Sequence, residues 1–201
     1  MNALLNLLNE NELQKVKISS YSKDAIIYHE DDLCNEITIV LEGVIEISSF
    51  SFQGLKMIYN TVLPNQLFGN NLIFSSDPHY KGNVICKIKC KIASIKKDAL
   101  VDIISGNQKF LEEYLKIQSD FGKTLNDKIK ILSFKSAEER FLFYLKIHNN
   151  QIRVNSIAFL AKELSLSREA TSRLITGLHN KGIISKDIIG NNIIITKLES
   201  E

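Results

Sequence analysis

The main change in the spacing of apolar residues along this 201-residue chain lies near Lys97. From Ala25 to about Ile95, apolar residues occur in short runs rich in Ile, Val, Tyr and Phe, separated by Gly, Asp, Asn and Pro. Such runs are typical of strands joined by tight turns. After Lys97 the period lengthens to that of helices. We therefore predict an α+β fold, with an N-terminal β domain followed by a helical half.

The predicted strands are short and evenly spaced, which favours an antiparallel β-roll of the double-stranded β-helix or jelly-roll type. They cover Ala25–Tyr28, Glu36–Leu41, Val44–Ser49, Lys56–Leu63, Gly82–Ile88 and Ala93–Lys96. Ahead of them, residues 1–18 carry leucines at a spacing that predicts a short amphipathic helix packed against the roll.

Composition places the chain among ordinary globular proteins, with 44% hydrophobic and 24% charged residues. Its apolar stretches are far shorter than the ~20 residues of a membrane-spanning helix, and the N-terminus lacks a basic leader and a small-residue cleavage site. We expect a cytoplasmic protein that does not bind a membrane. Net charge is +2, and residues 134–201 contain ten Lys and Arg against seven Asp and Glu, so the positive excess lies in the last third of the chain.

The three cysteines form no CxxC pair, which argues against a disulfide framework or a four-thiolate metal site. Buried free thiols are the simplest interpretation. If Cys86 and Cys90 lay on one extended strand, their sulfurs would be on the same face and ~13 Å apart. A redox response of these thiols is left open, but a direct disulfide between them is expected to be out of reach.

A long helix is predicted from about Gln108 to Leu132. One apolar stripe has the alternating spacing of a coiled coil, and a second lies beside it. The first contains Phe110, Tyr114, Ile117, Phe121 and Thr124, and the second contains Leu111, Leu115, Gln118, Leu125, Ile129 and Leu132. Two apolar faces need two partners, so we expect the first stripe to form a parallel dimer seam and the other to lie on the β domain. A helix buried wholly within one subunit is the alternative.

Two short helices are predicted next, separated by a tight turn. A helix over 136–146 has Ser136 and Glu139 in a capping-box arrangement. Residues 155–164 then form the first helix of the pair, Leu166 fills the turn, and Ser167 is placed to cap the second helix. This arrangement predicts a helix-turn-helix.

The second helix is expected to have an apolar inner face and a polar outer face. Inward positions are Ala170, Leu174, Ile175 and Leu178, and outward positions are Arg168, Glu169, Ser172, Arg173 and Thr176. Arginine matches guanine O6 and N7 with two donors, and a glutamate accepts from cytosine N4. The outer face therefore has the chemistry of a DNA major-groove surface. The tail, from Ile183 to Ile195, predicts a hairpin with its turn at 190–192, in the place of a wing.

Taken together, these motifs resemble those of the Crp/Fnr family of bacterial transcription regulators. The resemblance rests on the turn pattern Leu63–Gly69, on the long central helix and above all on Leu166–Leu174, and it covers nearly the whole chain. It implies a cyclic-nucleotide-binding-like β-roll over 1–106, a dimerisation helix over 107–133 and a winged helix-turn-helix over 134–201. The implied function is sequence-specific binding of a palindromic operator in double-stranded DNA by a homodimer, acting with RNA polymerase.

The resemblance also implies roles for individual residues. Arg168 and Arg173 are expected to contact guanines and Glu169 a cytosine, while Ser172 adds selectivity at a thymine. Ser156 and Ser167 are expected to bind phosphates.

The family's effector pocket, by contrast, is matched poorly. Its acidic ribose ligand is replaced by Asn70, and its arginine and serine positions hold Tyr80 and Lys81. Because neither Asn70 nor Tyr80 supplies a charge, cyclic AMP is not expected to bind, although Lys81 offers one positive contact. Residues 1–30 contain no cysteine for an iron–sulfur cluster, and no His or Cys has a spacing diagnostic of haem. We therefore expect no metal or cofactor, and the effector is not identified.

Other classes of function fit less well. The sequence contains no GxSxG, P-loop or HExxH motif, and its four histidines are scattered, so no enzyme activity is expected. The alternative is a ligand-binding module that regulates a protein partner, which explains the β-roll but leaves the arginine pair and the hairpin without a function.

Overall fold

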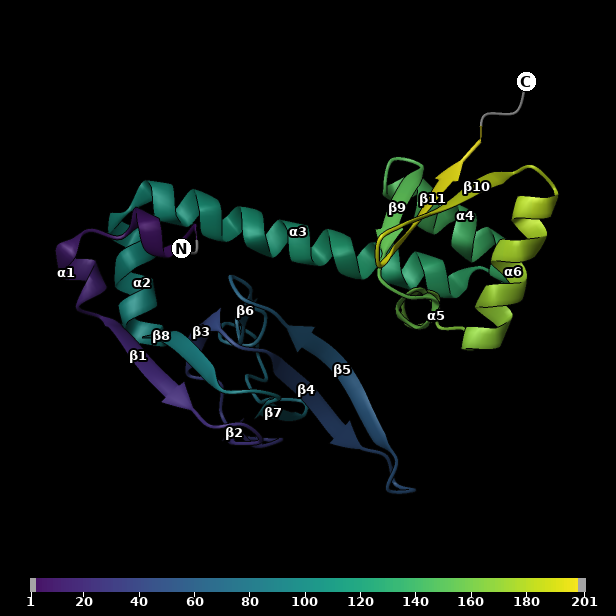
Figure 1. The fold of residues 1–201 in the computed structure, drawn as a ribbon. Helices are drawn as coiled ribbons and strands as arrows, with labels where there is room; N and C mark the ends of the chain where they lie inside the picture. The colour runs from purple at the N-terminus through teal and green to yellow at the C-terminus, as the bar shows by residue number, and fades with distance from the viewer. Residues whose placement is uncertain (1–2, 199–201) are drawn as a thin grey trace. The chain divides into compact units, whose positions relative to one another are not determined.

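The computed structural model describes residues 3–198 and has the expected α+β fold (Figure 1). The chain forms two compact units, one ending at Ser119 and the other beginning at Asp120. This division falls inside the long helix α3, Gln108–Ser133. The separate dimerisation segment expected over 107–133 therefore stays a proposal.

The first unit contains two four-stranded sheets in which neighbouring strands are antiparallel. One sheet has the order β1 (Val16–Tyr21), β8 (Cys90–Lys96), β3 (Glu36–Glu42) and β6 (Leu67–Phe68). The other has the order β2 (Ile26–Tyr28), β7 (Asn83–Cys86), β4 (Ile45–Phe50) and β5 (Lys56–Val62). This is the β-roll that the sequence predicts.

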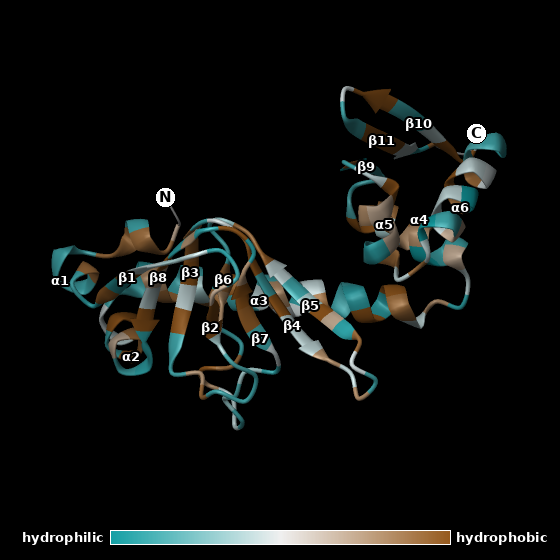
Figure 2. Ribbon diagram, turned by 60° about the horizontal axis from the view of Figure 1, so that its bottom comes forward, coloured by the Kyte–Doolittle hydropathy of each residue, from teal (hydrophilic) through white to brown (hydrophobic). Residues whose placement is uncertain are grey.

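Side chains of the roll's strands form the core of this unit. Hydrophobic and hydrophilic residues alternate in bands along several strands in Figure 2. The most deeply buried include Ile37, Ile39, Ile45, Ile92 and Ile95, each no more than 1% exposed. Burial of one such side chain contributes about 1.5–3 kcal/mol to the stability of the fold. Four of these five residues lie on β3 and β8, so these two strands contribute much of the core.

The N-terminal segment differs from the helix predicted over residues 1–18. A 3₁₀ turn over Leu5–Leu7 and a short helix α1, Glu10–Leu13, precede a strand that begins at Val16. The prediction is wrong from Val16 onward because β1 pairs with β8, with Val16 opposite Ile95. The backbone N–H and C=O groups of β1 form hydrogen bonds with β8, so they do not need the hydrogen bonds of a helix.

The turn after β6 explains the glycine in the Leu63–Gly69 motif. Gly69 has φ +79°, a conformation that favours glycine. A Cβ there would lie 2.8 Å from the carbonyl oxygen of Glu36 and 3.1 Å from the sulfur of Cys34. The chain can therefore approach β3 this closely only without a side chain.

Helix α2, Lys97–Gly106, leads into α3. The dimer seam predicted on α3 is wrong for its first residues. Phe110 and Tyr114 are 0% and 4% exposed, and Ile117 packs against the same core of the roll. Phe121 is half-buried and Thr124 is exposed. Because Phe110 and Tyr114 are already covered within their own unit, no second copy can reach them.

The second stripe of α3 is the one left uncovered. Leu115, Leu125, Ile129 and Leu132 are 53%, 48%, 62% and 46% exposed. With the half-buried Leu111, Gln118 and Gly122 they keep alternating steps of four and three residues, the spacing of a coiled-coil seam. A Cβ on Gly122 would meet nothing within 4 Å.

The cysteines are free and buried, as expected, but Cys86 and Cys90 do not lie on one strand. Strand β7 ends at Cys86 and β8 begins at Cys90 in the other sheet, so residues 87–89 turn between them. Burial, together with the nearby Cys90 thiol, raises the pKa of Cys86 to about 12. At neutral pH the Cys86 thiol therefore stays protonated and a poor nucleophile.

The second unit begins with the C-terminal half of α3 and continues with short helices and a three-stranded sheet. Its elements are α4 (Ala137–Ile147), β9 (Gln151–Val154), α5 (Ile157–Leu164), α6 (Arg168–Asn180), β10 (Ile184–Ile189) and β11 (Asn192–Lys197). The sheet has the order β10-β11-β9, so the predicted hairpin is present and adds β9 to one edge. Ser136 and Glu139 form the predicted capping box at the start of α4.

Candidate nucleic-acid interface

Two serines cap the helices of the predicted helix-turn-helix. The Ser156 hydroxyl accepts a hydrogen bond from the backbone N–H of Phe159 at 3.1 Å, at the start of α5. The Ser167 hydroxyl accepts from the N–H of Ala170 at 3.1 Å, at the start of α6. Each serine satisfies a backbone donor that has no partner within its helix. The start of each helix is thereby fixed by the local sequence.

A tight turn joins α5 to α6. Ser165 adopts the left-handed conformation with φ +53°, and the N–H of Leu166 donates to the carbonyl of Ala161 at 2.9 Å. This closes the C-terminus of α5 and directs the chain into α6. Ala161 is 4% exposed, and its small side chain suits the close contact between the two helices.

Helix α6 has one buried face and one polar face. Ile175 and Leu178 are each 1% exposed and pack in the core of the second unit, and Leu174 lies against it. Thr171 is fully buried, and its hydroxyl donates to the carbonyl of Ser167 at 2.9 Å. Sequence reasoning missed this residue because threonine is normally a surface residue, and only the intrahelical hydrogen bond makes its burial inexpensive.

The polar face consists of the five residues that the sequence placed outward. Arg168, Glu169, Ser172, Arg173 and Thr176 are all exposed. The first four line one shallow depression on the surface of α6. They come from two successive turns of a single helix, so their side chains share one face.

Neither arginine on this face has an ion-pair or hydrogen-bond partner within residues 3–198, and Glu169 and Ser172 have none there either. A guanidinium group with free donors can form the bidentate pair that guanine offers in the major groove. The face is therefore exposed, positively charged and unoccupied by other side chains of the described chain.

One contact beside this region was not predicted. Lys128, in the part of α3 that belongs to the second unit, donates to the carbonyl of Glu163 at 2.5 Å. No local sequence signal could have found it, because Lys128 and Glu163 are separated by 35 positions.

Comparisons with known proteins agree with this architecture. Residues 18–107 match the cyclic nucleotide-binding domain model. The anaerobic regulatory protein of Haemophilus influenzae is 27% identical over 210 residues, covering 95% of this chain and 79% of the relative. A transcriptional regulator from Thermotoga maritima is 27% identical with a TM-score of 0.56, covering 63% of this chain and 98% of that structure. A CooA mutant from Carboxydothermus hydrogenoformans is 18% identical with a TM-score of 0.71, covering 98% and 92%.

This chain is a transcription regulator that resembles those of the Crp/Fnr family. The relatives match along nearly its whole length, so both the β-roll and the helix-turn-helix fall within the similarity. In residues 3–198 no helix combines the length and apolar character needed to cross a bilayer.

The β-roll of this regulator gives its three effector-pocket candidates different environments. Tyr80 is 2% exposed and stacks on Tyr28, with ring centroids 4.6 Å apart. Asn70 is 5% exposed, and its side chain donates to Gln118 on α3. Lys81 is exposed and pairs with Asp77 at 2.5 Å. The three side chains therefore have separate environments: Tyr80 and Asn70 are enclosed, and Lys81 is at the surface.

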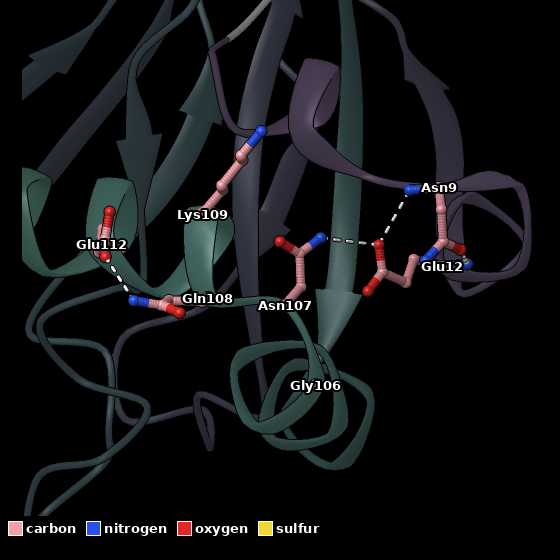
Figure 3. Close-up of a pocket in the computed structure, with 7 residues that line it drawn as sticks. All are labelled: Asn9, Glu12, Gly106, Asn107, Gln108, Lys109 and Glu112. Carbon is pink, nitrogen blue, oxygen red and sulfur yellow. Dashed lines mark hydrogen bonds between the residues drawn. The ribbon is translucent and has the colours of Figure 1, made fainter.

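Another depression of the first unit lies where α1, α2 and α3 meet (Figure 3). The Glu12 carboxylate there accepts hydrogen bonds from the Asn107 side chain at 3.0 Å and from the Asn9 N–H at 2.9 Å. Gln108 donates to Glu112 at 2.9 Å. These groups are paired with one another, so the depression is explained as a polar junction between helices.

Proposed function

We propose that this regulator binds a palindromic operator as a homodimer, with α6 of each subunit in the major groove. Arg168 and Arg173 contact guanines, Glu169 accepts from a cytosine, and Ser172 adds selectivity at a thymine. The observation that carries the proposal is the polar face of α6, where these four residues line one depression. On the opposite face Thr171, Ile175 and Leu178 are buried, which holds the polar face toward solvent.

The two capping serines are proposed to position the DNA backbone. Each hydroxyl accepts a backbone N–H at the start of its helix, which leaves its own proton available as a donor. At Ser156 this proton is directed to the Asn155 side chain at 3.3 Å, a long bond that a phosphate oxygen can replace. The N-termini of α5 and α6 also attract phosphate through the helix dipole.

The exposed stripe of α3 is proposed as the dimer seam, in place of the one expected from the sequence. Family members act as dimers, and a second copy is the partner whose seam has the same spacing. Leu125, Ile129 and Leu132 would pack against their counterparts in a parallel pair of helices. Gly122 leaves room for the two backbones to approach closely.

Cyclic AMP is not proposed as the effector. Asn70 and Tyr80 are neutral and buried, and both are already packed or hydrogen-bonded within the unit. A cyclic phosphate would have to displace these contacts without gaining a guanidinium partner. An iron–sulfur cluster is likewise not proposed, because no group of three or more His, Cys, Asp or Glu able to hold a metal ion is found within residues 3–198. Haem is not proposed either, because no His or Cys has a spacing diagnostic of it.

The regulator is proposed to act in the cytoplasm, where its DNA lies, and to change transcription through RNA polymerase, by recruiting it or by blocking its access. No catalytic activity is proposed. Transcription from an operator-containing template by purified polymerase, with and without the regulator, measures this step directly.

The DNA-binding proposal is tested by selection from a pool of random duplexes at several salt concentrations, followed by sequencing of the retained fraction. We expect enrichment of an inverted repeat with half-sites about one helical turn apart. Arg173→Ala should weaken binding to the selected site by about 1–3 kcal/mol and relax the base preference at one position of each half-site.

The matched control is Arg153→Ala, which removes an exposed arginine of the same unit, on β9, outside the polar face of α6. This variant should keep the base preference of the wild type. Equal loss of affinity for selected and random DNA in Arg173→Ala would contradict base recognition. Failure to enrich any inverted repeat would contradict operator binding by a dimer.

A further inference from the structure

Lys128 reaches from α3 to the C-terminal end of α5. Its ammonium group donates to the carbonyl of Glu163 at 2.5 Å and to that of Lys162 at 3.5 Å, and it lies 3.7 Å from the Glu163 carboxylate. The last carbonyls of a helix have no partner within it and carry partial negative charge. Lys128 therefore caps the C-terminus of α5 with a side chain from another helix.

This contact lies directly before the turn of the helix-turn-helix. Helix α5 ends at Leu164 and α6 begins at Arg168, with only three residues between them. The turn between them is fixed by the left-handed Ser165 and by the Leu166–Ala161 hydrogen bond. A displacement of the end of α5 is therefore passed to α6 through a connection with little freedom.

On α3, Lys128 lies among the residues of the proposed dimer seam. It directly precedes Ile129 and follows Leu125 by three positions, and both are exposed. Ile131, one turn further on, is 3% exposed and anchors α3 to the core of the second unit. Apolar burial holds α3 in place but is non-directional, whereas the hydrogen bonds of Lys128 have a preferred direction.

We propose that Lys128 is a positioning residue that sets the orientation of α6 relative to the dimer seam. The inference rests on the proposed function, because it assumes two copies of α6 held by paired α3 helices. A palindromic operator requires both recognition helices to reach successive grooves at a fixed separation. Lys128 acts through α5 and does not touch DNA in this arrangement.

The partial exposure of the contact makes the residue suitable for testing. The side chains of Lys128 and Glu163 are 37% and 33% exposed. Pairs exposed to this degree contribute little to stability, so Lys128→Met should fold and melt like the wild type. Lys123→Met is the matched control, because Lys123 is an exposed lysine of the same helix without a bonding partner in residues 3–198.

The experiment measures binding to three duplexes: the selected palindrome, a single half-site, and the palindrome with one base pair inserted at its centre. Lys128→Met should bind the palindrome about three- to thirtyfold more weakly than the wild type, with half-site affinity unchanged. It should also discriminate less against the inserted base pair. Lys128→Arg keeps the donors and should restore binding to the palindrome, and Lys123→Met should match the wild type on all three duplexes.

The outcomes separate the inference from the proposed function. Equal loss on half-site and palindrome would show that Lys128 only supports the fold of the helix-turn-helix, and would overturn the inference. So would a Lys128→Met variant that binds the palindrome as Lys123→Met does. A wild-type protein that binds the palindrome no better than one half-site would overturn the proposed dimeric function, and the inference with it.

Discussion

The Gln118 side-chain amide donates to the main-chain carbonyl of Asn70 at 2.8 Å, and the Asn70 side chain donates back to Gln118. Tyr114, one turn earlier on α3, directs its hydroxyl to the same carbonyl at 3.4 Å. The turn after β6 is therefore fastened to α3 by side chains of the protein itself. Asn70, which the sequence places at the expected ribose position of the effector pocket, is therefore bonded within the protein.

Gln118→Ala should destabilise the first unit by about 1–3 kcal/mol, because it leaves the buried side chain of Asn70 without its partner. The measurement is the free energy of unfolding in urea. Gln108→Ala is the control: Gln108 is an exposed glutamine of the same helix, bonded to Glu112. It should change stability by no more than about 0.5 kcal/mol. Equal effects of the two substitutions would mean that the Asn70 contact contributes nothing.

Leu125→Asp should convert the dimer to a monomer, because it places a charge in the middle of the proposed seam. Thr124→Asp is the matched control, since Thr124 is an exposed neighbour of Leu125 and belongs to the stripe first expected from the sequence. Sedimentation equilibrium distinguishes the two. If Thr124→Asp were a monomer and Leu125→Asp a dimer, the stripe predicted from the sequence would be the seam instead.

Ser167→Ala should lower the stability of the second unit by about 0.5–2 kcal/mol, because the N–H of Ala170 loses its capping acceptor. Ser172→Ala removes a hydroxyl from the exposed face of the same helix and should leave thermal unfolding unchanged. Its effect should appear only as altered base preference. If both variants have the same melting temperature and select the same DNA, Ser167 does not act as the cap and Ser172 does not contribute to base preference.

Glu46 provides a test of stability against pH. Burial alone would raise its pKa, but the hydrogen bond and charge of Lys56, 2.5 Å away, and the charge of Lys87 outweigh that effect and hold the pKa below its ordinary value. A lowered pKa in the folded state means that the ionised form stabilises the fold above the unfolded pKa of about 4.5. This contribution is lost as pH falls through the lower, folded value.

Glu46→Gln should therefore be less stable than the wild type at neutral pH, and the difference should shrink as pH falls below about 4.5 and disappear below the folded pKa of Glu46. Glu42→Gln, at an exposed glutamate at the end of β3, should show no such pH-dependent difference. Unfolding in urea at several pH values measures both. A difference that persists unchanged into acid would contradict the role assigned to the carboxylate.

Much of the fold follows from short-range signals. The capping box of Ser136 and Glu139, the Ser167 cap and the hairpin turn at 190–192 depend on residues within a few positions of one another. The sequence also separates the inner and outer faces of α6, because a helix of known period permits only one division of Arg168, Glu169 and Arg173 from Ile175 and Leu178.

Other features of the fold depend on which helices and strands pack against one another. The sequence contains two apolar stripes on α3 but no information on which one the roll covers, and packing places Phe110 and Tyr114 inside. The sequence does not show that Cys86 and Cys90 end and begin strands of two different sheets.

The local sequence by itself determined the elements and the chemistry of the α6 surface, since both depend on neighbours along the chain. The contacts of Lys128 with α5 and of Gln118 with Asn70 join positions 35 and 48 residues apart. Only the tertiary structure decided these pairings, because long-range hydrogen bonds form wherever packing brings a donor and an acceptor together.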